Sequence, residues 1–163
     1  MTDPDDPFLP AELNLGEDDV VETVEKISGH DGVGTRREGR ERALALLFEA
    51  EQRGIQPPAQ ILAELPLEPE PFARTLVEGV SEHLEEIDAV ISRRSVAWPL
   101  ERMPAIDRCL LRMGTFELAY SDVPIGVCIS EGVELAKRYS TDESHKFLNG
   151  MLAAIGREVR PMA

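Results

Sequence analysis

The residues whose chemistry stands out most are three arginines near the start of a helical pattern. At about 100° per residue, Arg36, Arg37 and Arg40 fall on the same side of a helix as Leu44. Positive side chains near a helix N-terminus oppose its dipole, and a bound phosphate would relieve that arrangement. Burying all three unpaired would be costly, so the pattern predicts that the first turns project and present the arginines to an anion. The alternative is a solvated charged face with pairs such as Arg37 with Glu41.

A second polar cluster lies at residues 140–150, where another helix is expected to begin. Free backbone N–H groups, the hydroxyl of Ser144, the amine of Lys146 and the ring of Phe147 suit both phosphate binding and base stacking. The alternative is a capping box, with Ser140 and Glu143 at the spacing that such a cap requires and Phe147 in the core.

A third cluster precedes and begins the helix that follows Pro104. Glu101, Arg102 and Asp107 lie at the edge of an apolar surface formed by Trp and Leu residues. Such an edge suits a protein partner, although charges placed to complement the helix dipole are an equally good explanation.

Residue patterns typical of catalysis or of metal binding are missing. The three histidines lie far apart, and the sequence has no Gly-rich phosphate loop, GxSxG elbow or HExxH motif. Cys109 and Cys128 have neither metal-ligand spacing nor a disulfide framework, so we expect reduced core thiols. No apolar run approaches the roughly 18 residues of a membrane span. We therefore expect no enzyme, no cofactor, no metal site and no membrane contact, with the cytoplasm as the compartment.

Charge divides the chain into two parts. The 163 residues carry a net charge of −14, which argues against a diffuse electrostatic grip on nucleic acid and requires a local patch instead. Residues 1–34 hold ten acidic residues and one basic residue and end in a Gly-rich stretch. We interpret them as an acidic tail and linker, in which a short helix over residues 17–26 is an even possibility, and residues 35–160 as one folded domain.

The apolar spacing is helical throughout the folded part and predicts an all-α protein of six or seven helices in two short bundles. The first helix spans about residues 36–53 and ends at Gly54, which suits a left-handed cap. A short second helix begins at Pro57 and Pro58. One apolar stripe then runs from residue 72 to as far as residue 91. Three more follow: over residues 106–120, from 124, and after the Ser140 cap with Phe147, Met151 and Ile155. Gly150 is expected inside the last helix, where it would allow close packing.

Several motifs together resemble the NusB family of transcription antitermination factors. They comprise residues 40–44 (RERAL) through Phe48, 98–106 (WPLERMPAI), 110–113 (LLRM), 117–118 (EL), 129–137 (ISEGVELAK) and 144–152 (SHKFLNGML). The resemblance covers about residues 36–157, and its last two motifs are the most specific. It implies two helical bundles and a non-enzymatic factor that binds single-stranded boxA RNA of ribosomal RNA operons with NusE, a small-subunit ribosomal protein. RNA polymerase, NusA and NusG complete the implied assembly.

The resemblance also implies site residues, position by position. The implied RNA-binding residues are Arg36, Arg37, Arg40, Phe48, Glu143, Ser144, Lys146 and Phe147. The implied NusE-facing residues are Glu101, Asp107 and, more weakly, Arg102. Three positions depart from the family: Phe48 replaces a frequent Tyr and loses a hydroxyl, Glu143 replaces a frequent Asp, and Asp107 is shorter than the Glu that is common there.

Two questions stay open at the level of the sequence. The chain could instead be a homodimer or a protein adaptor that uses the same faces without RNA; this reading predicts self-association that is insensitive to salt. We do not expect a ribosomal RNA methyltransferase with a NusB-like front part, because these 163 residues leave no room for its cofactor-binding domain. The acidic tail either competes with RNA for the arginines, held near them by the linker, or only aids solubility.

Overall fold

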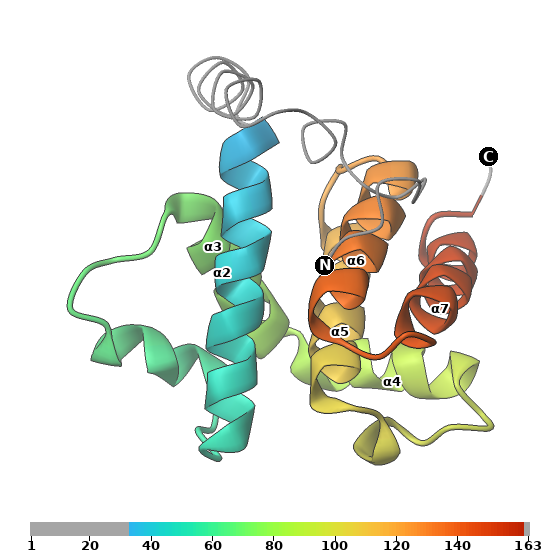
Figure 1. Ribbon diagram of the computed structural model, residues 1–163, viewed down its shortest axis with the longest axis horizontal. Coiled ribbons are helices and arrows are strands. Elements are labelled where there is room, and N and C mark those ends of the chain that lie inside the picture. Colours follow the sequence, from blue (N-terminus) through green and yellow to red (C-terminus); the bar gives the residue numbers. More distant parts are fainter. Residues whose placement is uncertain (1–32, 162–163) are drawn as a thin grey trace.

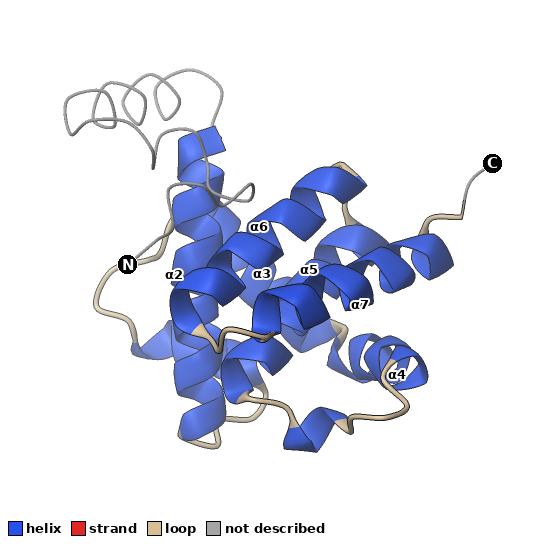
Figure 2. Cartoon of the chain, turned by 45° about the vertical axis from the view of Figure 1, so that its right-hand side comes forward, coloured by secondary structure: helices blue, strands red, loops and turns tan. Residues whose placement is uncertain are grey.

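The computed structural model describes residues 33–161, and this part of the chain is helical without any strand (Figure 2). The prediction of an all-α protein is confirmed. Six α-helices and two 3-10 helices follow one another: α2 (Val33–Gln52), η2 (Pro58–Glu64), α3 (Pro71–Glu82), α4 (Leu84–Arg94), η3 (Leu100–Arg102), α5 (Ala105–Tyr120), α6 (Ile125–Tyr139) and α7 (Ser144–Val159). The helix suggested over residues 17–26 lies outside the described residues, as does nearly all of the acidic tail.

The helices form two bundles that meet at α5 (Figure 1). The first consists of α2, η2 and α3, and the second of α4, α5, α6 and α7, with α5 packed against both. One buried cluster runs through the two bundles, from Leu44 and Leu76 in the first to Leu110 and Leu152 in the second. Burying these aliphatic side chains provides the main driving force for folding.

The ends of the first two helices agree with the sequence prediction. Gly54 follows α2 with a φ of 67°, and its N–H donates to the carbonyl of Glu51. Only glycine adopts this left-handed conformation without strain, so the chain turns here. Pro57 then caps η2 and Pro58 is its first residue, as the sequence predicted for the short second helix.

The apolar stripe from residue 72 to 91 is divided between two helices. His83 ends α3 and precedes α4 with φ −105° and ψ 21°, so the chain changes direction there. The stripe did not predict this break, because Ile87 and Ile91 are buried and keep the helical spacing of the residues before it. The His83 ring stacks on Tyr120 of α5, with ring centroids 3.8 Å apart.

Close helix packing occurs at glycines other than the one that the sequence suggested. Gly150 lies inside α7 as predicted, but it is exposed, and a Cβ there would meet nothing within 4 Å. The expectation of close packing at Gly150 is therefore wrong. A Cβ at Gly114 of α5 or at Gly132 of α6 would lie 2.6 Å or 2.9 Å from a methyl group of Leu152, so these are the points where α5 and α6 approach α7.

Candidate nucleic-acid interface

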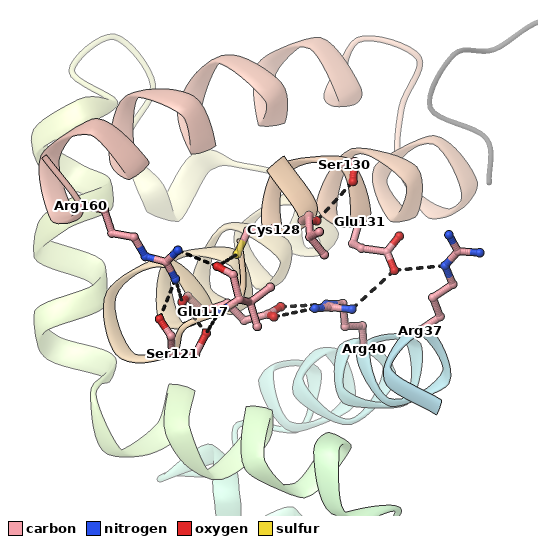
Figure 3. A network of polar contacts seen from close by, with 10 residues as sticks. Arg37, Arg40, Glu117, Ser121, Cys128, Ser130, Glu131 and Arg160 are labelled. Atoms are coloured by element: carbon pink, nitrogen blue, oxygen red, sulfur yellow. Dashed lines mark hydrogen bonds and ion pairs between the residues drawn. The ribbon is translucent and has the colours of Figure 1, made fainter. Parts of the chain in front are cut away.

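Arg40 is buried between α2, α5 and α6 and is not presented to solvent (Figure 3). Its side chain is 4% exposed, and its Nε and Nη2 donate to the two carboxylate oxygens of Glu117 at 2.9 Å and 2.7 Å. The guanidinium group also lies over the ring of Phe72, 5.1 Å from the centroid. The expectation that the first turns present all three arginines to an anion is wrong for Arg40, because an internal carboxylate already occupies its hydrogen-bonding edge.

The charge of Arg40 is maintained despite its burial. Burial lowers the pKa of this guanidinium group, but the hydrogen bonds and charge of Glu117, aided by Glu131, raise it overall. Glu131 of α6 lies 3.5 Å from Arg40 and 3.3 Å from the Nε of Arg37. The two glutamates thus tie the start of α2 to the second bundle, a role that the sequence reasoning did not assign to them.

The far end of the network in Figure 3 anchors the end of α5. The guanidinium group of Arg160 donates to the carbonyls of Leu118, Val123, Glu117 and Ser121 at distances between 2.6 and 2.9 Å. The last carbonyls of a helix have no partner within the helix, so a cation that caps them is favourable. This cap holds the α5–α6 connection in place and thereby supports Glu117.

The other cations predicted to bind RNA lie on α2 and on α7. Arg36 is exposed and rests over the Phe72 ring at 5.5 Å, while the side chain of Arg37 is 32% exposed. Lys146, the third residue of α7, is exposed. Phe48 lies further along α2, half-buried against the core, so only part of its ring can reach a base.

The C-terminal end of α6 connects these two groups (Figure 2). The hydroxyl of Tyr139 donates to Glu41 of α2 at 2.6 Å, and Arg138 lies 3.5 Å from the same carboxylate. Tyr139 is 47% exposed. Its pKa is raised, chiefly by the hydrogen bond to Glu41, so the hydroxyl stays protonated. The sequence analysis missed both residues; an aromatic beside a cation at a helix end was the available signal.

At the start of α7 the aromatic ring is only partly accessible. Phe147 packs against Trp98, with ring centroids 4.8 Å apart and the planes tilted by 57°. Glu143 is exposed and precedes the helix. It makes no side-chain cap bond, so the predicted capping box of Ser140 and Glu143 is wrong. The hydroxyl of Ser140 instead donates to Asp107.

Two more of the predicted binding residues, besides Arg40, are internal. Asp107 is fully buried and accepts hydroxyl hydrogens from Ser140 and Ser144, so its carboxylate cannot face a partner directly. Ser144 is 2% exposed and likewise cannot line an RNA path. The outward placement expected for both residues is wrong, because each is the hydrogen-bond partner of the other inside the protein. Glu101 and Arg102, by contrast, are exposed on η3, where a partner can reach them.

The described residues hold no group of three or more side chains suited to a metal ion. Within the same part of the chain, no helix combines the length and the apolar character that a membrane span requires. Cys109 and Cys128 are buried and unpaired, as predicted. The fold and the site together define a small helical protein with cations and aromatic rings at the start of α2, the end of α6 and the start of α7, and with two bundles tied together by a buried ion pair.

Comparison with known proteins identifies the family. The NusB family model matches residues 37–157. The transcription antitermination protein NusB of Kineococcus radiotolerans is 53% identical over 128 residues, covering 76% of this chain and 93% of the relative. That of Clavibacter sepedonicus is 46% identical over 132 residues, covering 76% and 96%. The chain therefore belongs to the NusB family, and the predictions of this family and of a non-enzymatic protein are confirmed.

Solved structures support the same conclusion. NusB of T. maritima superposes with a TM-score of 0.71 at 39% identity, covering 77% of this chain and 93% of that one. A crystal structure of the antitermination factors NusB and NusE in complex with double-stranded RNA matches with a TM-score of 0.64 at 29% identity, covering 76% and 96%. The predicted NusB-like fold is confirmed.

Proposed function

We propose that this chain, together with NusE, binds single-stranded boxA RNA of ribosomal RNA operons and helps RNA polymerase to elongate past terminators. The observation that carries the proposal is the band of exposed and half-buried cations and rings that extends from α2 across the end of α6 to α7. Its members are Arg36, Arg37, Arg138, Tyr139, Lys146 and Phe147. Cations along such a band neutralise phosphates, and the rings support unstacked bases.

The shape of the band favours a single strand over a duplex. Phe147 and Tyr139 offer ring surface that a base can reach only when it is unpaired. The neighbouring carboxylates of Glu41 and Glu131 reduce the positive potential there. We therefore expect weak binding by this chain alone, with NusE supplying further contacts.

The NusE contact is proposed for η3 and the residues around it. Glu101 and Arg102 are exposed there, and both can form ion pairs at the rim of an interface. Asp107 contributes to this surface only by holding the start of α5. The wider assembly with RNA polymerase, NusA and NusG, and the location in the cytoplasm, are part of the same proposal.

The test is fluorescence anisotropy of a short boxA-type RNA, titrated with this chain and with its NusE complex, against a scrambled RNA. The proposal expects tighter and sequence-selective binding by the complex, weakened by Arg36→Ala and Lys146→Ala. The matched control is Arg53→Ala, which removes an exposed cation directly after the C-terminal end of α2. Equal binding to both RNAs, or salt-insensitive self-association without RNA binding, would instead support the adaptor or homodimer.

A further inference from the structure

Asp107 is the centre of a compact hydrogen-bonded lock between α5 and α7. Its Oδ1 accepts from Ser140 at 2.5 Å, and its Oδ2 accepts from Ser144 at 2.8 Å. Both serine hydroxyl groups thus donate their hydrogens to Asp107. The hydroxyl of Thr141, which lies 2.7 Å from the Oγ of Ser144, therefore donates to that Oγ. The backbone N–H of Thr141 also donates to that oxygen, at 3.3 Å. We call Asp107, Ser140, Thr141 and Ser144 the hydroxyl lock.

The position of Asp107 explains how its carboxylate can be fully buried. Both of its oxygens accept hydrogen bonds from serine hydroxyl groups. Asp107 lies in the first turn of α5, and Ser144 is the first residue of α7. Two helix N-termini, each with a positive dipole end, therefore face the same carboxylate and stabilise its negative charge.

The lock determines where the beginning of α7 lies. It ties residues 140–144, which connect α6 to α7, to the beginning of α5. Lys146 and Phe147 follow within one turn, and Phe147 packs against Trp98, which precedes η3. We infer that Asp107 is a positioning residue for RNA binding: through Ser140 and Ser144 it holds Lys146 and Phe147 in the conformation that binds the strand. This inference rests on the proposed function.

The hydroxyl lock affects binding by holding the start of α7 in its bound conformation before RNA arrives. Thr141, Asp142 and Glu143 are exposed and form a short connection that only the lock and the helices restrain. Without the lock, this connection would become ordered only when RNA binds. The entropy lost at that moment would lower the affinity for RNA. The lock also lies close to the segment proposed for NusE, since Trp98 and Asp107 flank η3 on its two sides.

The test compares Asp107→Asn and Ser144→Ala with Asp142→Asn. Asp142 is exposed in the same connection, and no polar contact involves it among the described residues. Asp107→Asn and Asp142→Asn remove the same charge near the RNA, so electrostatics alone predicts equal or tighter binding for both. The hydroxyl lock instead predicts weaker RNA binding for Asp107→Asn, by about 10-fold in affinity, and a similar loss for Ser144→Ala.

Two further readouts separate positioning from general instability and from failure of the proposed function. Anisotropy is measured with the NusE complex at a temperature where circular dichroism shows every variant folded. Trp98 is the single tryptophan, so its emission reports the Phe147 contact, and we expect a red shift in both lock variants. If Asp107→Asn does not fold, the RNA affinity and the Trp98 emission of Ser144→Ala decide whether the inference holds.

Unchanged or tighter RNA binding by both lock variants would overturn the inference. If even the wild type binds no RNA, the proposed function fails on its own. Trp98 emission then still decides whether the lock positions α7, and an unshifted emission would overturn it.

Discussion

Replacing Arg40 by methionine removes one half of the buried ion pair that ties α2 to α5. The remaining carboxylate of Glu117 is 4% exposed and loses two hydrogen bonds, of 2.9 Å and 2.7 Å. Hydrogen bonds to charged groups contribute about 1.5–3 kcal/mol each. Removing one partner of a buried pair costs about 3–5 kcal/mol in measured cases. Both arguments predict that Arg40→Met lowers the free energy of unfolding by about 4 kcal/mol, a large share of the total stability of an ordinary domain.

Urea unfolding, followed by circular dichroism at the helical band, measures this loss. The double variant Arg40→Met with Glu117→Met should recover most of it, because an apolar pair of similar volume often replaces a buried ion pair without cost. Arg36→Ala is the matched control: Arg36 is exposed on the same helix, and its loss should change stability by no more than about 0.5 kcal/mol. A loss below about 1 kcal/mol for Arg40→Met, or additive losses in the double variant, would refute the reasoning.

Four other predictions concern packing, burial and charge. Gly79→Ala should destabilise the protein by about 1–3 kcal/mol, because a Cβ there would collide with the Phe116 ring. Gly150→Ala, where a Cβ meets nothing, should stabilise it by about 0.5–1 kcal/mol, and thermal unfolding of the two variants checks both signs. Burial raises the pKa of Cys109 to about 12 and that of Cys128 to about 11, so both thiols should react with iodoacetamide only after unfolding, as mass spectrometry would show. The affinity of the chain alone for single-stranded RNA should fall with log salt at a slope of about −2 to −3, as expected for three or four phosphate contacts, and a slope near zero would contradict the proposed face.

Sequence signals predicted the helical fold well where the structure depends on residues that are close together in the chain. Gly54 turns the chain because of its backbone freedom, and the prolines at 57 and 58 begin the next helix because their φ is already restricted. The aliphatic stripes predicted the core because their spacing matches a helix. The break at His83 escaped prediction, since a stripe that continues in register does not show whether the helix does.

The candidate site was predicted less well, and the reason is the distance along the chain between partners. Arg36 and Arg40 are equivalent by helical periodicity, yet one is exposed and the other buried. The difference is made by Glu117, 77 residues away. Asp107 was expected at the surface, but Ser144, 37 residues further along, gives it internal partners.

The sequence by itself determined that this protein is all-α, that its charge allows only a local nucleic-acid patch, and which family it resembles. These properties depend on composition and on spacing within a few helical turns. The tertiary structure alone decided which polar side chains remain available to a ligand. A buried charge is stable only beside a partner that the fold brings to it, so the inward position of Arg40 and Asp107 depends on how the helices pack.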